Sequence, residues 1–402
     1  MSSHTPSSRR GDSVALRPDD PLLADAAGEY RSAYVHIPFC LRRCPYCDFA
    51  IVDESAVGRS EVSRYVEAII AEIEMEDPFG PLDAVNFGGG TPTRLTADQL
   101  GGILDEISDK FGLTDGVEVS LEANPEDWTP QLASELVEAG FTRVSMGAQS
   151  FDDDVLVALG RNHDARSIVS AVESARNAEF GSVSVDLIFG QPIETDRSWD
   201  QTVRSALSLG PDHISTYSLT VEAGTALSRD VLAGGPAPDA DVQASRYERF
   251  VELAAPAGII RYELSNHART GHACRYNLAT WSHAEYVAFG LGAHDHRNGR
   301  RGRNHRRLDR YLEAVEADVR PRIGVETIDG ETADGDRLML GLRLAAGVPL
   351  DPPARRFVAS NAGQRLIEAG VMDERKGRLV VLKPMLTDAV VREALSVSSG
   401  DC

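Results

Sequence analysis

Short apolar runs alternate with amphipathic stretches along the chain from Tyr30 onward. The runs have the length and β-branched content of buried strands, whereas the stretches between them repeat apolar residues every three or four positions, as helices do. Strands are predicted at 33–37, 82–87, 116–123, 143–150, 182–190 and 213–220, and helices near 61–76, 96–110, 129–139, 165–179, 198–208 and 239–257. The pattern therefore predicts six strand–helix units in succession.

Repeated strand–helix units predict an α/β fold with a parallel sheet, because each helix returns the chain to the same end of the sheet by a right-handed crossover. The periodicity leaves open whether the sheet is doubly wound or curled into a full or partial barrel. In each of these folds the binding groups gather at the carboxyl ends of the strands. The unusual motifs of this chain all lie where a predicted strand ends.

After residue 310 the pattern changes to helices with short β pieces, at 333–347, 356–370 and 377–395. This change favours a separate small α+β domain of the winged-helix type. Residues 1–29 are polar, contain proline and serine, and have no apolar periodicity, so we expect a disordered leader there.

The charge of the chain narrows the possible partners. The 41 basic and 62 acidic residues give a net charge of -21, which argues against a general nucleic-acid surface. No segment comes close to the run of about 18 apolar residues that is needed to span a membrane. The start of the sequence also lacks the basic-then-apolar pattern of a secretory signal. We therefore expect a cytoplasmic protein without a membrane span.

Three of the five cysteines, Cys40, Cys44 and Cys47, lie close together after the first predicted strand. Such a cluster is not a disulfide framework, and its spacing lets one loop wrap a corner of an iron-sulfur cluster. Since a 4Fe-4S cluster normally has four thiolate ligands, three thiolates leave one iron open to a substrate. Structural zinc is the alternative, but it requires a fourth ligand, and His36 is poorly directed to supply one.

The loop resembles the C-x3-C-x2-C segment of the radical S-adenosylmethionine (SAM) superfamily. The resemblance implies a partial (β/α)6 TIM-like barrel and a 4Fe-4S cluster whose open iron binds the amino and carboxylate groups of SAM. In that family an electron from the cluster cleaves SAM to a 5'-deoxyadenosyl radical, while the protein positions the reactants and excludes water. The resemblance also implies that Tyr46, just before the last cysteine, packs beside adenine.

A glycine run ends the second predicted strand, and glycines there permit close approach of the backbone to a ligand. The run resembles the family's GGTP segment, which implies that Gly89, Gly90 and Thr91 contact the SAM amino group and flank its carboxylate. Over roughly residues 30–395 the chain resembles the oxygen-independent coproporphyrinogen III oxidase branch of the superfamily. This match implies further SAM contacts from Glu122, Gln149, Arg161 and Asp186, and also from Tyr34 and Thr220.

Two functions compete within this branch. The oxidases convert two propionate side chains of coproporphyrinogen III to vinyl groups by radical decarboxylation, whereas the haem chaperones bind haem and pass it to acceptor proteins. Oxidases have a fourth cysteine two residues after the third, where this chain has Phe49 after Asp48. They also carry a long N-terminal extension that residues 1–29 do not match. Both differences favour a haem chaperone over an oxidase. A third possibility is another radical SAM enzyme of this branch, with methylation or cyclopropanation chemistry.

The expected haem ligand is less clear, because the chain departs from a haem-associated motif of these chaperones, CRHNxxYW. Here Tyr276 stands in place of the histidine and Thr280 in place of the tyrosine. Tyr276 could bind ferric haem as a phenolate, or a nearby histidine such as His294 could serve instead. Histidines lie in this region at 267, 272, 283, 294, 296 and 305.

The segment 295–310 contains seven arginines and only two aspartates. These arginines could bind haem propionates, or the segment could be a solvated linker between domains. These arginines are at 297, 300, 301, 303, 306, 307 and 310.

We expect a leader (1–29), a radical SAM core (30–265), a connecting segment with the haem-like motif (266–310) and a C-terminal domain of the type found in this branch (311–402). The mixed charge of that domain does not favour DNA binding, so the expected partners are haem and an unidentified haem-acceptor protein.

Overall fold

The computed structural model describes residues 30–398, and the leader predicted at 1–29 lies outside them. Parallel strands that neighbour one another in chain order form the centre of its main sheet. They are β1 (Ser32–Ile37), β4 (Leu82–Gly89), β5 (Leu113–Ala123), β6 (Arg143–Gln149), β7 (Ser182–Phe189) and β8 (His213–Ser218). The predicted α/β fold and its succession of strand–helix units are confirmed.

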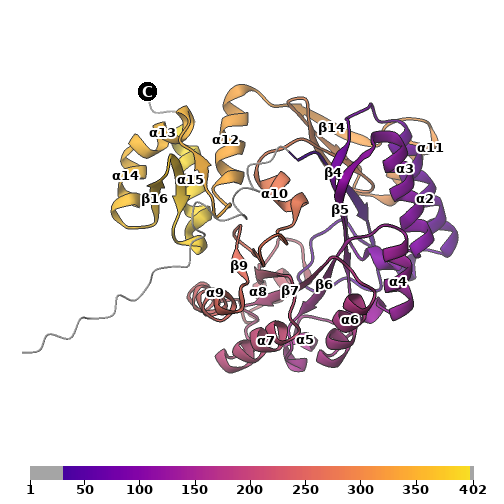
Figure 1. Cartoon of the computed structure of the whole chain (residues 1–402), viewed down its shortest axis with the longest axis horizontal. Coiled ribbons are helices and arrows are strands. Elements are labelled where there is room, and N and C mark those ends of the chain that lie inside the picture. Colours follow the sequence, from indigo (N-terminus) through magenta and orange to yellow (C-terminus); the bar gives the residue numbers. More distant parts are fainter. Residues whose placement is uncertain (1–29, 399–402) are drawn as a thin grey trace, which may run out of the picture.

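Helices follow these strands and cover the outer side of the curved sheet, where α2, α3, α4, α6 and α7 are seen in Figure 1. The helices of this part are α2 (Arg59–Glu74), α3 (Ala97–Phe111), α4 (Pro130–Glu138), α5 (Asp153–Ala158), α6 (Ala165–Asn177), α7 (Asp196–Ser208), α8 (Ala226–Leu232) and α9 (Ala240–Ala254). Side-chain caps such as Thr96, Asp164 and Thr195 fix the starts of α3, α6 and α7.

The two faces of the sheet differ in polarity, and β7 shows the difference most clearly. Val183, Val185 and Leu187 are buried in the core that the sheet shares with the helices. Ser184 and Asp186 lie on the opposite, inner face, because successive side chains of a strand point to opposite sides. Parallel sheets covered on both faces usually carry continuous apolar runs, so this alternation marks the inner face as a polar surface.

Short strands extend the sheet beyond both ends of the parallel set. On one side β11 (Tyr286–Phe289) runs parallel to β1 and leads into the antiparallel strands β12 (His294–Arg297), β13 (Arg300–Asn304) and β14 (Arg322–Thr327). On the other side β10 (Asn266–Ala268) and β9 (Ile260–Arg261) follow β8. The outermost strands β14 and β9 do not pair, so the barrel is partial.

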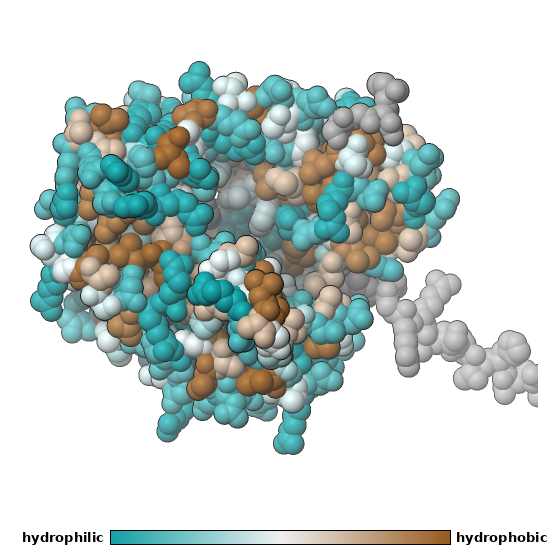
Figure 2. All heavy atoms as spheres, turned by 180° about the vertical axis from the view of Figure 1, so that it is seen from behind, coloured by the Kyte–Doolittle hydropathy of each residue, from teal (hydrophilic) through white to brown (hydrophobic). Residues whose placement is uncertain are grey.

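The segment 266–310, expected to connect two domains, therefore supplies strands of the main sheet, which continues to Thr327. It also contains α10 (Arg275–Trp281), which lies on the inner side of the sheet, and α11 (Leu308–Glu316) begins within it (Figure 1). Seen from behind, the molecule is mostly hydrophilic and is hollowed near its centre, where the inner side of the sheet lies (Figure 2).

The C-terminal part has a core of its own, which includes Leu338, Phe357 and Leu379. Its elements are α12 (Gly330–Gly341), β15 (Val348–Pro349), α13 (Pro352–Ala359), α14 (Asn361–Glu368), β16 (Met372–Arg375), β17 (Arg378–Val381) and α15 (Thr387–Ser398). As predicted, this part has the element order of a winged helix, in which a helix and a strand are followed by two helices and two strands. No helix within residues 30–398 is long and apolar enough to cross a membrane.

Candidate functional site

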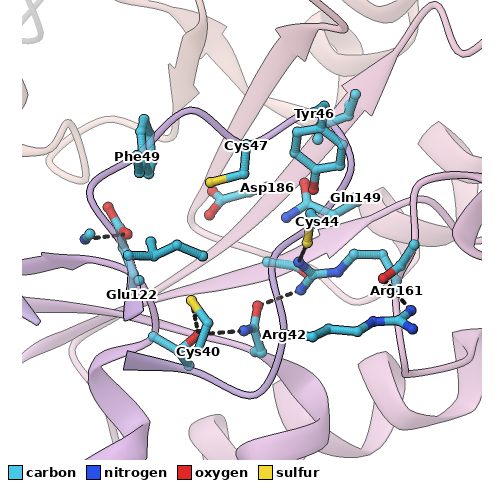
Figure 3. A pocket seen from close by; sticks show the side chains of 18 of the residues that line it. Cys40, Arg42, Cys44, Tyr46, Cys47, Phe49, Glu122, Gln149, Arg161 and Asp186 are labelled. Atoms are coloured by element: carbon cyan, nitrogen blue, oxygen red, sulfur yellow. Dashed lines mark hydrogen bonds between the residues drawn. The ribbon is translucent and has the colours of Figure 1, made fainter. Parts of the chain in front are cut away.

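A cavity of about 370 Å³ lies where the central strands end, and the cysteine loop forms one of its walls (Figure 3). It brings together nearly all the residues that the sequence analysis assigned to the cluster and to SAM. Those that line it are Cys40, Cys44, Tyr46, Cys47, Gly89, Gly90, Thr91, Glu122, Gln149, Arg161, Asp186 and Thr220. Tyr34 does not line the cavity.

Backbone contacts hold the cysteine loop in place. The loop leaves β2 (Phe39–Cys40) and returns to β3 (Val52–Asp53), and these two short strands pair in parallel. Arg43 donates to the carbonyl oxygens of Cys47 (3.2 Å), Phe49 (3.1 Å) and Ile51 (3.2 Å). Arg42 donates to the carbonyl oxygen of Gly160 at 2.5 Å. The Arg43 guanidinium thus links backbone groups within the loop, and the Arg42 guanidinium links the loop to Gly160 on the opposite side of the cavity.

The three thiols suit an iron-sulfur cluster by type and placement. Cys40 Sγ lies 3.7 Å from Thr91 Oγ1, and Arg161 donates to Cys44 Sγ at 3.5 Å. All three cysteines line the cavity, and in residues 30–398 no group of three Cys, His, Asp or Glu side chains is arranged to hold a single metal ion. Burial raises the pKa of Cys40 to about 11 and also raises that of Cys47. Binding of iron must therefore displace protons from these two thiols.

Gly89 and Gly90 let the end of β4 pack against the end of β1. Gly89 has a φ of +110°, and a Cβ atom there would lie 2.5 Å from the ring of His36. A Cβ atom at Gly90 would lie 2.7 Å from the carbonyl group of Pro38. From their place at a strand end, these glycines were expected to allow the approach of a ligand. The structure shows that the chain itself also needs both glycines, because they make room for His36 and Pro38, which precede the cysteine loop.

Two carboxyl groups form the acidic floor of the cavity. Glu122 accepts a hydrogen bond from the backbone N–H of Gly89 at 3.2 Å, and burial, followed by the nearby Asp186, raises the pKa of Glu122 to about 7. Asp186 accepts from the hydroxyl groups of Ser145 (2.8 Å) and Ser215 (2.7 Å), while burial raises its pKa. Burial thus disfavours the ionised form of both groups, and a cationic ligand beside them would favour it.

The opposite wall carries a positive charge that Asn124 positions. Arg161 donates to Asn124 Oδ1 and to the carbonyl oxygen of Gly147 at 3.2 Å, and Asn124 Nδ2 donates to Thr91 Oγ1 at 2.9 Å. The sequence analysis missed Asn124, although it lies directly after a predicted strand, as the assigned residues do. Gln149, at the end of β6, has a backbone φ of +65°. Non-glycine residues with this strained backbone conformation are often found at functional sites.

Tyr34 and Tyr276, expected to contact SAM and haem, lie beneath the cavity, whereas Tyr46 lines it. Tyr34 is close to Glu122, since a Cβ atom at Gly88 would lie within 3.1 Å of both side chains. The ring of Tyr276 stacks on Tyr34, with a centroid distance of 5.8 Å and an interplanar angle of 21°. Burial raises the pKa of the Tyr276 hydroxyl group, which makes a phenolate costly there.

His294, by contrast, is exposed at the start of β12. It pairs in the sheet with Arg303, and both Arg303 and Arg306 lower its pKa, after burial. Three other histidines of this region are engaged elsewhere: His267 is buried against Phe250, and His283 stacks on His296.

Four of the seven neighbouring arginines form ion pairs with carboxylates, namely those at 297, 301, 307 and 310. Within the described part of the chain, Arg300, Arg303 and Arg306 have no carboxylate partner.

Comparison with known proteins agrees with this geometry. The family model of the radical SAM superfamily matches residues 34–206. The heme chaperone HemW of Mycobacterium tuberculosis is 37% identical over 384 residues, which cover 93% of this chain and 97% of the relative. Heme chaperone HemW of Bacillus subtilis is 34% identical, covering 83% and 88%. Coproporphyrinogen III oxidase (HemN) from Escherichia coli shares the fold, with a TM-score of 0.76 at 20% identity and coverage of 94% and 92%.

Proposed function

Since the chain belongs to the HemW haem chaperone family of radical SAM proteins, we propose that it binds haem and passes it to an acceptor protein. The observation that carries the proposal is the cysteine loop itself. Three thiols line the cavity, and the exposed Asp48 and Phe49 follow the third. The remaining cysteine of residues 30–398, Cys274, is buried in a separate cluster with Tyr262 and Leu278.

We assign the 4Fe-4S cluster to Cys40, Cys44 and Cys47 and SAM to the rest of the cavity. When bound, these groups supply one-electron chemistry, which no side chain can provide. The guanidinium of Arg161 suits the SAM carboxylate, and the carboxyl groups of Glu122 and Asp186 suit its ammonium group or ribose hydroxyls. The remaining proposed contacts are Tyr46, Gly89, Gly90, Thr91, Gln149 and Thr220, with Tyr34 supporting the floor from below.

For haem we favour His294 over Tyr276 as the axial ligand. His294 is exposed and neighbours two arginines that lack carboxylate partners, so the propionates of a haem on His294 would meet positive charge. Tyr276 is stacked under the cavity, and burial disfavours its ionisation. The cysteines at 40, 44, 47 and 274 are free thiols, which agrees with the reducing cytoplasm that we propose as the site of action.

Hemin titration followed by the Soret band tests the proposal. The wild-type protein should bind one hemin per chain. His294→Ala should weaken binding by about tenfold or more and change the band position, whereas Tyr276→Phe should bind like wild type. Failure of the wild-type protein to bind hemin would refute the chaperone function. Normal binding by the His294 variant together with loss in the Tyr276 variant would refute the ligand assignment alone.

A further inference from the structure

A second hollow lies on the other side of the cysteine loop. We call it the outer hollow, and it has a volume of about 460 Å³. The loop separates it from the SAM cavity, because Cys44, Cys47 and Asp48 line both spaces. The rest of the outer hollow is formed by Arg43, Arg229 and Arg306 and by the loop 223–226. A cluster held by the thiols would therefore be separated from solvent at this point by the thickness of one loop.

The outer hollow is positively charged in a strongly acidic protein. Its three arginines are exposed, and each donates to a backbone carbonyl oxygen: Arg43 to Cys47, Arg229 to Gly224 and Arg306 to Asp48. Among the described residues none of the three arginines has an ion pair, and Asp48 is the one carboxylate in the lining. The chain as a whole carries a net charge of -21, so this local excess of positive charge is distinctive.

Uncompensated positive charge around an exposed hollow attracts an acidic partner and orients it during encounter. Here the orientation brings the partner to a place where two of the cluster ligands, Cys44 and Cys47, line the hollow. We propose that the outer hollow is the docking site of an acidic, low-potential one-electron carrier protein that reduces the cluster. The carrier loses one electron and the cluster gains it, with no bond formed or broken. This inference rests on the proposed cluster but not on haem binding.

Stopped-flow reduction of the reconstituted protein distinguishes docking from simple access. The probe is a reduced acidic plant-type ferredoxin, a low-potential one-electron carrier, and the reference reductant is reduced methyl viologen, a small cation. The variants are Arg229→Glu and Arg306→Gln, the latter keeping an amide donor for the Asp48 carbonyl. Arg300→Glu is the matched control, since Arg300 is exposed, lacks a carboxylate partner and lies at the far end of β13 from Arg303.

At low ionic strength, Arg229→Glu should lower the second-order rate constant with ferredoxin by roughly tenfold, and high salt should remove the difference. Methyl viologen should reduce this variant as fast as wild type or faster, and ferredoxin binding measured by calorimetry should weaken in parallel. Arg306→Gln should show a smaller loss, and Arg300→Glu should match wild type.

Equal ferredoxin rates in wild type and Arg229→Glu would overturn the docking proposal, as would an equal loss in Arg300→Glu. Parallel losses with ferredoxin and methyl viologen would also overturn it, since they would indicate a damaged cluster site. If wild-type protein takes up no iron, the proposed cluster fails instead, which iron counting establishes before any rate is measured.

Discussion

At the scale of single residues, the site depends on the absence of a side chain at Gly89. The ring of His36 fills the space where a Cβ atom would lie, and it cannot move away easily. One of its nitrogens lies 3.1 Å from the Tyr34 hydroxyl group and the other 2.8 Å from the Ala50 carbonyl oxygen. Burial lowers the pKa of His36 to about 4, so the ring is neutral at physiological pH.

Replacing this glycine should therefore damage both stability and binding. We expect Gly89→Ala to lower the free energy of unfolding by about 2–4 kcal/mol, from backbone strain and from the clash with His36. SAM binding, measured by equilibrium dialysis of the reconstituted protein, should weaken as well. The control is Gly102→Ala, in the interior of α3 with nothing within 4 Å of the new Cβ atom, which should gain up to about 1 kcal/mol. Equal denaturation midpoints for the two variants would contradict this account.

At the scale of secondary-structure elements, a buried carboxyl group ties α2 to the strands beyond β1. Glu72 on α2 accepts hydrogen bonds from the Gly290 N–H (2.8 Å), the Tyr311 hydroxyl (2.7 Å) and the Asn304 amide (2.6 Å). These partners come from the end of β11, from α11 and from β13. Burial raises the pKa of Glu72 to about 7 despite these bonds, which favour the ionised form.

This raised pKa predicts a stability that falls with pH. Between about pH 4.5 and 7 the folded chain keeps a proton on Glu72 that the unfolded chain has lost. The contribution of Glu72 to the free energy of unfolding is therefore fully present below about pH 4.5 and is lost as the pH rises through about 7. In urea unfolding, the advantage of wild type over Glu72→Gln should therefore shrink by on the order of 2 kcal/mol from pH 5 to pH 8. Glu67→Gln, at an exposed position of α2, should show no such change; an equal change there would contradict the assignment.

The same elements show what the sequence could and could not predict. The central strands and the helices around them were predicted within a few residues, since their apolar periodicity is strong. Strands β12, β13 and β14 were missed because they read His-Asp-His-Arg, Arg-Arg-Gly-Arg-Asn and Arg-Ile-Gly-Val-Glu-Thr, with little apolar alternation. Their pairing depends on contacts between distant parts of the chain, which periodicity within one segment does not reveal.

The resemblance to the radical SAM family supplied the site residues, and their convergence was predictable from the strands, because the carboxyl ends of parallel strands meet at one edge whatever the exact curvature. The layer beneath them was not predictable. Tyr34 was assigned to SAM by its position in β1, yet its side chain meets Tyr276 from a helix more than two hundred residues later. Only the path of α10 through the inner side of the barrel brings these two rings together.

At the scale of the whole molecule, the winged-helix part contacts the barrel through Leu344, through Met385, which packs against the barrel core, and through a few polar groups. Leu344, just after α12, is buried among Tyr262, Ala273 and Leu278 of the barrel. Next to it the backbone N–H of Ala345 donates to the Tyr262 carbonyl oxygen at 2.9 Å, and Arg301 pairs with Asp336 at 2.8 Å. Apart from Leu344 and Met385, the apolar residues of the two parts belong to separate cores.

Removing the Leu344 side chain should weaken the coupling between the two parts. Leu344→Ala leaves a cavity between them and should cost about 2–4 kcal/mol. In differential scanning calorimetry we expect it to broaden or split the unfolding transition. Leu338→Ala, within the core of the winged-helix part, should instead lower the stability of that part while its contact with the barrel remains. A sharp single transition in Leu344→Ala, at the wild-type temperature, would show that the contact does not couple the two parts.

The central claim, that this radical SAM protein carries haem and does not make its precursor, is tested by one anaerobic assay. The reconstituted protein is incubated with SAM, a reductant and either hemin or coproporphyrinogen III, and the tetrapyrroles are analysed by mass spectrometry. Our account predicts one haem retained per chain, with both propionates intact, and no change to coproporphyrinogen. Repeated turnover of coproporphyrinogen III to the divinyl product, with hemin unbound, would contradict it.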